Sequence, residues 1–340
     1  MKRIGIICPS EIAFRRFLPA FKEAGCFEYA GVAIANKEEF VGATDEILAK
    51  ERAKAQTFVD NYGGKIYEGY RNLIESEDVD AVYLPLPPGL HYQWAKVALN
   101  AGKHILVEKP CTTALVNTLD LLQKAENKNL AVHENYMFAF HDQLKAVNDI
   151  VDSGEIGDVR LYRISFGFPL RAQNDFRYNK ALGGGALLDC GGYTFKYASM
   201  LLGPTAKMKY AQSNNIDGFN VDMYGSAALV NDEGVTAQVA FGMDHNYKCE
   251  LEVWGSKGTI YTNRILTAPA GFTPEVTIRK GNDEEKRNLP ADDAFKKSIL
   301  HFSHCIEDDK TRKENYETLL KQAKLVEDFK QLSGINNKTI

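Results

Sequence analysis

The segment GKHILVEKPC, residues 102–111, joins a short apolar run to an abrupt charged end. Its run HILV has the composition of a buried strand, and Glu108 and Lys109 follow that run directly. Pro110 ends the strand because it has no N–H to donate, and it biases Lys109 toward an extended conformation. The segment therefore predicts a buried strand that stops where it presents a charged pair.

Similar apolar runs alternate with helical segments up to about residue 135. Because the runs are continuous rather than alternating in polarity, they predict strands buried on both faces of a parallel sheet. Helical segments, several of which end in glycine, lie between them. This repetition predicts a doubly wound Rossmann sheet, an α/β fold that binds dinucleotides. The runs are IGIIC (4–8), AGVAIA (30–35), DAVYLPL (80–86), HILV (104–107) and LAVH (130–133).

The pattern changes after residue 153. Runs of alternating polarity, separated by turn signals such as NDEG and SKG, predict a large mixed, mainly antiparallel sheet with one face against a core. Helical segments frame this sheet, which predicts an α+β domain. We expect residues 1–122 to form the dinucleotide-binding domain and residues 123–340 to form a domain for substrate binding and oligomerisation. The predicted strands are LYRISFGF, YGSAALV, TAQVAFGM, CELEVWG and GTIYTN.

Length and composition exclude several classes of protein. A chain of 340 residues exceeds what one hydrophobic core usually supports, which favours two domains. The formal net charge of −4 gives no broad basic field, so we expect no nucleic acid partner. The six cysteines are scattered without CxxC spacing, which argues against zinc and disulfides and favours the cytoplasm. The N-terminal apolar run is too short for a signal peptide or a membrane span.

Ligands of an open parallel sheet lie beyond the carboxyl ends of its strands. Glu108 and Lys109 would line a cofactor crevice there, although a surface ion pair at a strand end is the alternative. In the first strand–helix turn, Cys8 and Ser10 stand where a dinucleotide-binding turn has its first two glycines, and Ala13 replaces the third. Ser10 is a good N-cap, and a helix N-terminus offers N–H groups to a phosphate. A purely structural turn is the alternative here.

Together these segments resemble the Gfo/Idh/MocA oxidoreductases, such as glucose–fructose oxidoreductase and inositol dehydrogenase. The resemblance covers nearly the whole chain, and the EKP strand end is its most specific element. It implies a Rossmann domain followed by an α+β domain whose sheet often forms dimers or tetramers, so we expect a homodimer or homotetramer. It also implies that Lys109 lies by the nicotinamide and the sugar, and that the Lys109–Pro110 peptide is cis. The segments that carry it are RIGIICPSEIA, DVDAVYLPLPPGLHYQWAKVALNAGKHILVEKP, GEIGDV, GGGALLDCGGY and LEVWGSKGTI.

The segment GGGALLDCGGYTFKY, residues 183–197, supplies two further candidates for catalysis. Asp189 and Tyr193 are four residues apart and share one face of a helix, although an N-terminal acid and a packed tyrosine would give the same spacing. The family's D-x-x-x-[H/Y] pattern falls on this pair. Reduction of a ketone needs a proton, and a phenol with a usual pKa near ~10 donates only if a cation stabilises its phenolate. The resemblance thus implies that Tyr193 donates, Lys109 is the cation, and Asp189 orients substrate hydroxyls or the lysine.

The end of the second strand, AGVAIANKEE, bears on the choice of cofactor. A carboxylate there would bind the ribose 2′-hydroxyl of NAD, but this chain has Asn36 and then Lys37. A neutral side chain and a cation accept a 2′-phosphate, which favours NADP(H) over NAD(H); a solvated Lys37 is the alternative. The expected cofactor contacts are Cys8, Ser10, Glu11, Ile12, Asn36, Lys37, Leu86, Pro87, His91, Glu108, Lys109 and Asn135.

Three further segments bear on the substrate. HENYMFAFHDQ, residues 133–143, resembles a segment of nucleotide-sugar 3-ketoreductases, and its Tyr136 and Phe138 would flank a sugar or the nicotinamide. LPLPPGLH resembles the family's P-N-x-x-H loop, with Pro88 in place of the asparagine. Arg177 in FRYNK would pair with a diphosphate, although a surface arginine is the simpler interpretation. The expected substrate contacts are Tyr136, Phe138, Arg177, Asp189 and Tyr193.

We therefore expect an NADP-dependent oxidoreductase that transfers a hydride between nicotinamide and a sugar carbonyl or hydroxyl, in the direction that reduces a nucleotide-linked keto sugar. Within the enzyme class, a polyol or trans-diol dehydrogenase is the alternative. Outside it, a catalytically weak dinucleotide-binding protein is the alternative, because Cys8 and Ser10 depart from the glycine pattern. We expect no metal site and no membrane partner.

Overall fold

The computed structural model describes residues 1–40 and 42–335. Within them the chain forms two compact units. The first unit comprises Met1–Asn135 and Phe295–Leu320, and the second comprises Tyr136–Ala294 and the segment that begins at Lys321. These units divide the chain at other positions than the expected boundary after residue 122. The last residues of the expected second domain, 336–340, lie outside the described part.

Two features account for this division. The strand β6 (Val132–Glu134) pairs with β5 (His104–Val107) and so extends the first unit beyond residue 122. Residues 295–320 also belong to the first unit, because their apolar side chains pack on it: the ring of Phe302 stacks on Phe27 with 5.6 Å between the centroids. The C-terminal part of the chain therefore serves both units.

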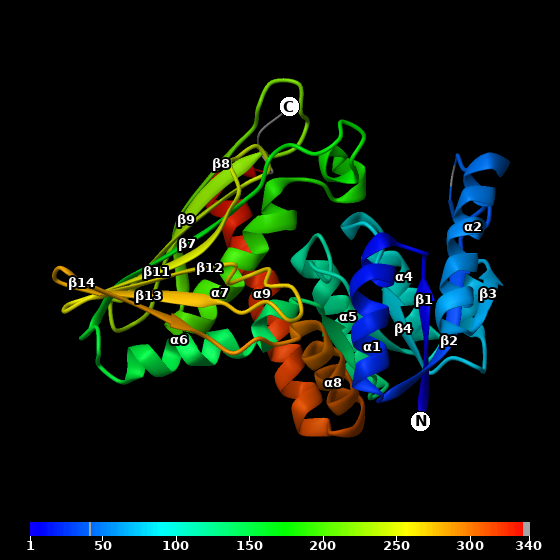
Figure 1. Cartoon of the computed structure of the whole chain (residues 1–340). Helices are drawn as coiled ribbons and strands as arrows, with labels where there is room; N and C mark the ends of the chain where they lie inside the picture. The colour runs from blue at the N-terminus through cyan, green and yellow to red at the C-terminus, as the bar shows by residue number, and fades with distance from the viewer. Residues whose placement is uncertain (41, 336–340) are drawn as a thin grey trace. The chain divides into compact units, whose positions relative to one another are not determined.

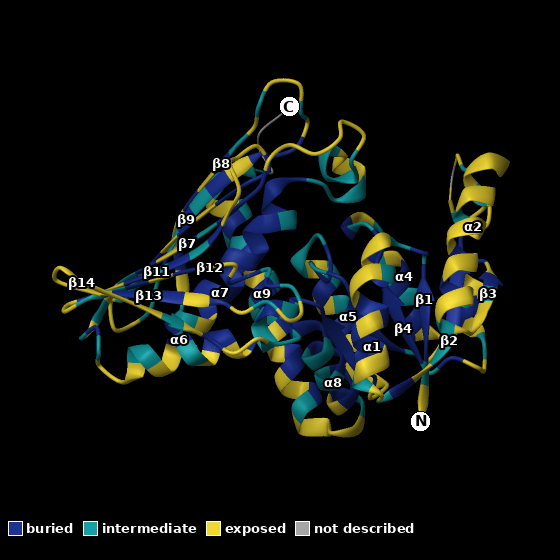
Figure 2. Cartoon of the chain, viewed as in Figure 1, coloured by how far each residue is buried: buried dark blue, intermediate teal, exposed yellow. Residues whose placement is uncertain are grey.

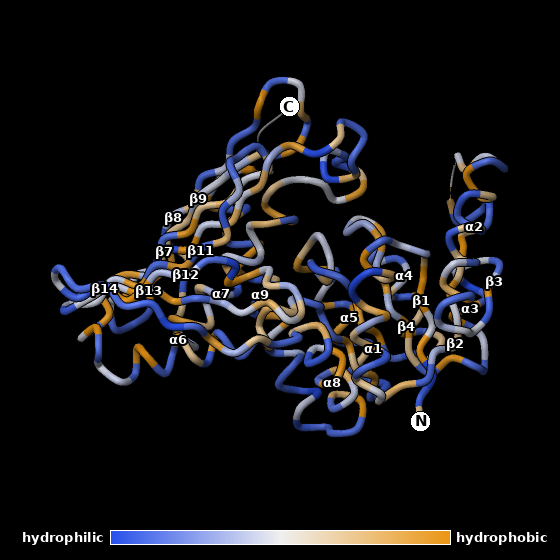
Figure 3. Tube along the Cα trace, viewed as in Figure 1, coloured by the Kyte–Doolittle hydropathy of each residue, from blue (hydrophilic) through white to orange (hydrophobic). Residues whose placement is uncertain are grey.

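Within the described residues, the first unit is built on six parallel strands in the order β3-β2-β1-β4-β5-β6 (Figure 1). The predicted doubly wound α/β sheet is confirmed: β4 is buried along its length and β1 from Ile4 to Ile7, where its isoleucines are hydrophobic (Figure 3). The edge strand β3 was not predicted, because its sequence KIYE has one fully buried residue. The strand order reverses between β1 and β4, the point where such sheets bind ligands. The remaining strands are β1 (Lys2–Ile7), β2 (Phe27–Ile34), β3 (Lys65–Glu68) and β4 (Ala81–Leu84).

Helices connect these strands, and their ends carry the expected signals. The helix α2 (Asp45–Tyr62) begins after Thr44, whose hydroxyl accepts a hydrogen bond from the Ile47 amide at 3.2 Å. Most of α2 is exposed in Figure 2, since it buries mainly Ala55 and Phe58. The other helices of this unit are η1 (Ala13–Phe17), α1 (Leu18–Ala24), α3 (Tyr70–Glu75), α4 (Pro88–Asn100), α5 (Leu115–Asn127), α8 (Ala294–Glu307) and the first part of α9 (Asp309–Ser333).

In the described part of the second unit, eight strands form a sheet in the order β14-β13-β12-β11-β7-β10-β9-β8. The pairing of β7 with β10 is parallel and the others are antiparallel, which confirms the predicted mixed sheet. Three strands were not predicted, β8, β13 and β14; the last has the hydrophilic sequence DEEKRN (Figure 3). The strands are β7 (Val159–Gly167), β8 (Lys207–Asn214), β9 (Tyr224–Val230), β10 (Thr236–Gly242), β11 (Lys248–Gly255), β12 (Thr259–Asn263), β13 (Glu275–Lys280) and β14 (Asp283–Asn288).

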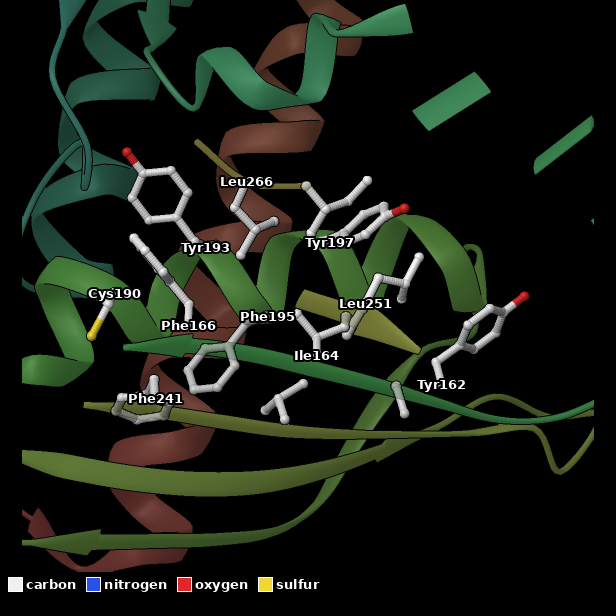
Figure 4. Packing of buried hydrophobic residues seen from close by; sticks show 14 of the residues in the cluster. Tyr162, Ile164, Phe166, Cys190, Tyr193, Phe195, Tyr197, Phe241, Leu251 and Leu266 are labelled. Atoms are coloured by element: carbon white, nitrogen blue, oxygen red, sulfur yellow. The ribbon is translucent and has the colours of Figure 1, made fainter. Parts of the chain in front are cut away.

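The core of the second unit lies between this sheet and the helix α7 (Gly192–Leu202), which packs on β7, β9 and β10. In Figure 4 the rings of Phe195 and Phe241 lie against the sheet. The approach is so close that a Cβ on Gly191 would lie 3.0 Å from the ring of Phe241. The remaining helices of this unit are η2 (Met137–Phe140), α6 (Asp142–Asp152), η3 (Phe176–Tyr178), η4 (Lys180–Leu182) and η5 (Leu187–Gly191).

Candidate active site

The strand β5 delivers the EKP residues to the carboxyl edge of the first sheet. Glu108 is buried, and its Oε1 accepts hydrogen bonds from the Tyr83 hydroxyl and the Asn135 amide at 2.7 Å each. Burial raises the pKa of Glu108, and the two donors oppose that effect. Lys109 is half-buried, and the Lys109–Pro110 peptide is cis, as the resemblance implies. Glu108 is thus held by two hydrogen bonds, while the neighbouring lysine retains access to solvent.

His91 supports this strand end through two backbone carbonyls. Its ring is fully buried, with Nδ1 2.8 Å from the Pro110 carbonyl oxygen and Nε2 2.7 Å from that of Leu86. Burial, together with the charge of Lys109, lowers the pKa of His91 to about 4. A neutral ring donates to one of the two carbonyls, so His91 ties the loop after β4 to the loop after β5. We expected His91 to contact a cofactor; any such role is indirect, because the backbone occupies both ring nitrogens.

The first strand–helix turn keeps the shape of a phosphate site without its glycines. Cys8 has φ +81°, the left-handed conformation that a glycine usually supplies at this position. Burial raises the pKa of the Cys8 thiol to about 12, so it adds no negative charge. The Ser10 hydroxyl accepts from the Ala13 amide at 3.2 Å, as expected of an N-cap. The amides of Glu11 and Ile12, which a helix cannot satisfy internally, remain for an external acceptor.

The turn also has space beside it. A hollow of about 470 Å3 adjoins it, lined on one side by residues of the turn and on the other by Glu51, Lys54, Thr57 and Phe58 of α2. Donors, a neutral thiol and room for a ligand therefore occur together, and these residues fit the phosphates of a dinucleotide.

The residues expected to select NADP(H) lie at the end of β2. The Asn36 side chain accepts from the amides of Glu38 and Glu39 at 3.0 Å each, so it shapes the turn rather than projecting from it. Lys37 lies 2.6 Å from Asp45, with 63% and 86% of the two side chains exposed. A surface pair of this kind contributes only about 0.2–1 kcal/mol, so a phosphate can replace Asp45 as the partner of Lys37.

In the second unit, Asp189 and Tyr193 lie on a helix that begins with the π turn η5 and continues as α7. Asp222 holds its start: its carboxylate accepts from the Leu187 amide at 2.6 Å and its backbone oxygen accepts from the Ala186 amide at 2.8 Å. No sequence motif pointed to Asp222, because it lies 35 residues from Leu187. π turns are rare and occur frequently at functional sites, which agrees with the position of Asp189.

Arg177 contacts the carboxylate expected to be catalytic. Its Nε donates to Asp189 at 2.8 Å and its Nη1 to Asp175 at 3.1 Å, and all three side chains are largely buried. Two carboxylates already bind this guanidinium, which does not support the expected contact of Arg177 with a diphosphate. Asp175 was missed, although the local pattern DFR was a possible signal: the Asp175 carboxylate also accepts from the Arg177 amide at 3.0 Å.

Aromatic rings surround Tyr193. Its ring meets Tyr136 edge-on with 5.0 Å between the centroids, Phe138 at 5.6 Å and Phe166 at 5.3 Å. Figure 4 shows its hydroxyl pointing away from the sheet. Tyr136 and Phe138 are each 1% exposed, so they pack around Tyr193 and leave no surface on which a sugar would lie, contrary to our expectation.

The residues expected at the site thus lie in two sets. Lys109, Glu108 and the residues of the turn belong to the first unit, and Asp189 and Tyr193 belong to the second. Among the described residues, no group of three or more histidine, cysteine and acidic side chains forms a potential metal site. Over the same residues, none of the helices combines the length and apolar character needed to span a bilayer.

Two family models match the chain. Residues 4–136 match GFO_IDH_MocA, described as an oxidoreductase family with an NAD-binding Rossmann fold, and residues 144–261 match the GFO/IDH/MocA C-terminal domain. Curated relatives named dTDP-3,4-didehydro-2,6-dideoxy-alpha-D-glucose 3-reductase include one from Actinomadura kijaniata, 38% identical over 96% of this chain and 93% of the relative. Another, from Streptomyces violaceoruber, is 39% identical over 98% and 96%.

A solved structure is also similar to the chain. KijD10, a 3-ketoreductase from Actinomadura kijaniata in complex with NADP and TDP-benzene, has a TM-score of 0.89 at 37% identity, with 97% of both chains covered. Structures of KijD10 variants replace one tyrosine by phenylalanine and one lysine by alanine. The number of positions between that lysine and that tyrosine equals the number between Lys109 and Tyr193.

Proposed function

Because this chain belongs to the Gfo/Idh/MocA family of oxidoreductases, we propose that it uses NADPH to reduce the keto group of a sugar linked to a nucleoside diphosphate. The observation that carries the proposal is its similarity, over 97% of the chain, to a 3-ketoreductase solved with NADP and TDP-benzene. The relatives named as dTDP-keto-sugar 3-reductases support the same substrate class.

The first unit would hold the cofactor. The amides of Glu11 and Ile12 face the expected position of a phosphate, and a helix N-terminus favours negative charge there. Lys37 would exchange its exposed partner Asp45 for the 2′-phosphate that distinguishes NADP(H) from NAD(H). The Glu108 carboxylate, buried and held by two donors, would fix the backbone from which Lys109 extends.

The second unit would supply the proton. NADPH, when bound, provides a hydride from C4 of its nicotinamide, and the developing alkoxide then needs a proton. Tyr193 is the proposed donor, with Lys109 as the cation that stabilises its phenolate. The matching separation of the varied lysine and tyrosine in KijD10 supports these two roles. Asp189, held by Arg177, would orient the sugar hydroxyls.

Arg171 is a better candidate than Arg177 for the diphosphate. Arg177 already has two carboxylate partners, whereas Arg171 has no carboxylate partner among the described residues. The Arg171 side chain is exposed, and its guanidinium lies 5.0 Å from the centre of the Phe168 ring. We therefore assign the diphosphate contact to Arg171.

The outer face of the second sheet would form a homodimer or homotetramer. The helix α7 covers one face of this sheet, and aromatic side chains are exposed on the other, including Tyr210 at 53% and Trp254 at 48%. The Arg163 guanidinium lies over the Trp254 ring at 5.4 Å. Light scattering on the full chain tests this, and a monomer at micromolar concentration would contradict it.

Calorimetry with NADPH present tests the substrate class. We expect at least one of TDP, UDP and CDP to bind, and glucose, inositol and a trans-diol not to bind at equal concentration. The reason is that a diphosphate adds two charges, which form charge-assisted hydrogen bonds with charged side chains. Turnover of a free polyol or diol, without a response to any nucleotide, would instead identify a dehydrogenase. Cofactor binding without turnover of any keto sugar nucleotide would favour a catalytically weak binding protein.

A further inference from the structure

A chain of buried polar side chains runs through the first unit, from the EKP strand end to the C-terminal helices. The Asn135 amide donates to Glu108 at 2.7 Å, and the Ser298 hydroxyl donates to the Asn135 amide oxygen at 2.8 Å. Nε2 of His133 lies 2.9 Å from the Ser298 oxygen, and its Nδ1 lies 3.1 Å from the amide oxygen of Asn315. Every member is at most 8% exposed.

The partners of this chain determine the direction of its hydrogen bonds. Asn315 donates its amide to the Val132 carbonyl at 2.6 Å, so its oxygen faces His133 and accepts from Nδ1. At the other end, the single proton of Ser298 goes to Asn135, so the Ser298 oxygen accepts from Nε2. Both ring nitrogens of His133 are therefore donors, and a histidine with two N–H groups is a cation.

We propose that His133 is a buried imidazolium, that it is the counter-charge of Glu108 through Ser298 and Asn135, and that this relay positions the backbone of Lys109. A buried charge is tolerated when it is paired and hydrogen-bonded at each end. Among the groups that face the relay are the Tyr83 hydroxyl and Lys109 at Glu108, and the His301 ring, 5.2 Å from that of His133.

His91 is a natural comparison for His133. Its two ring nitrogens also face acceptors, but its charged neighbour is Lys109, a cation, and burial keeps its ring neutral. The relay of His133 ends instead on a carboxylate. The carboxylate at the end of the relay explains why one buried histidine is charged and the other is neutral.

The relay gives the C-terminal helices a role in the site of the first unit. Ser298 lies on α8 and Asn315 on α9, far along the chain from the strand end that they support. The proposed effect on Lys109 rests on the proposed reductase function, but the charge of His133 does not. His133, Ser298 and Asn135 are positioning residues, since they act on the site through Glu108.

Nitrogen NMR of the full chain, labelled with 15N-histidine, tests the charge. The chain has seven histidines, and the variant His133→Gln identifies the His133 signals by their loss. Near neutral pH we expect both His133 nitrogens to be protonated with similar shifts, and the His91 ring in the same spectrum to have one protonated and one unprotonated nitrogen. An unprotonated nitrogen on His133 would overturn the charge pair.

Variants of Ser298 test the relay. Ser298→Ala should leave Nε2 without its acceptor and return His133 to a neutral ring, whereas Ser298→Thr keeps the hydroxyl and should preserve the imidazolium. Ser303→Ala, at another buried serine of α8, is the matched control and should change neither histidine. An imidazolium that persists in Ser298→Ala would contradict the relay.

Kinetics test the positioning role separately. With a keto sugar nucleotide that the enzyme reduces, Ser298→Ala should lower kcat by roughly ten-fold and leave the KM for NADPH nearly unchanged, because small displacements of a catalytic group are costly. A kcat equal to that of Ser303→Ala would refute the positioning of Lys109. If no keto sugar nucleotide is reduced, the proposed function fails, and the NMR result still decides the charge of His133.

Discussion

Replacing Arg177 by methionine tests whether the Asp175–Arg177–Asp189 cluster stabilises the helix that carries Asp189 and Tyr193. Methionine keeps much of the apolar stem of the side chain and removes the guanidinium. The Asp189 and Asp175 carboxylates would then lose the guanidinium that binds both of them, with only 12% and 18% of their side chains exposed. The variant should therefore unfold more easily than the natural chain.

The size of the effect follows from the burial of the cluster. Removing one partner of a fully buried ion pair costs about 3–5 kcal/mol, and an exposed pair contributes about 0–1 kcal/mol. The Arg177 side chain is 21% exposed, between these limits but nearer the first. We expect Arg177→Met to lower the free energy of unfolding by about 2–3 kcal/mol.

Urea unfolding, followed by circular dichroism, measures this loss. Arg171→Met is the matched control, because Arg171 lies on the same loop without a carboxylate partner among the described residues, and it should change stability by less than about 0.5 kcal/mol. Adding Asp189→Asn to Arg177→Met should restore part of the loss, since it removes one of the two carboxylate charges that the guanidinium had neutralised. Equal stability of the two arginine variants, or an additive double variant, would refute the reasoning.

Acid should destabilise the first unit. Burial lowers the pKa of both His91 and His104 to about 4, whereas an unfolded imidazole titrates near pH ~6.5. The unfolded chain therefore binds protons first as the pH falls. Between pH ~6.5 and pH ~4, each histidine should lower the free energy of unfolding by up to about 3 kcal/mol. Urea titrations at stepped pH measure this, and a flat profile over that window would contradict it. Lys37→Ala should remove most of the preference for NADPH over NADH, which is worth about 1.5–3 kcal/mol. Asp45→Asn, which frees Lys37 from its ion pair, should increase the affinity for NADPH in fluorescence titrations. Equal affinities of the natural chain for both cofactors would exclude this assignment. Tyr193→Phe should lower kcat by ~10²–10⁴-fold without weakening NADPH, and an unchanged kcat with a clear isotope effect from deuterated cofactor would give the proton to another donor.

The sequence predicted those strands whose burial can be inferred from their own residues. The five apolar runs of the first sheet are buried on both faces, and each is recognisable alone. β3 and β14 were missed because their residues are mostly polar and their places depend on the neighbouring strands. The same limit applies to residues 295–320, whose helical pattern was clear but whose packing on the first unit depends on the tertiary structure.

The candidate site divides in a similar way. Lys109, Asp189 and Tyr193 were identified as candidates because they stand in short motifs. The residues that support them, such as Ser298 and Asp222, were not identified, because they lie far away along the chain and no local spacing indicates their contacts. Burial also changed the expected contacts of Tyr136, Phe138 and Arg177, since the sequence shows that a side chain is aromatic or charged but not what already surrounds it.

The π turns η1 and η5 make the chain sensitive to length at the places where they occur. η1 follows the first strand–helix turn directly, and η5 lies between the glycines at 183–185 and α7. A helix turns by about 100° per residue, so deleting one residue of η5 would rotate Leu187 by that angle relative to Tyr193 and break its contact with Asp222. Substitutions that preserve the residue count leave this rotation intact. Relatives should therefore vary in residue identity around Asp189 much more readily than in the number of residues there.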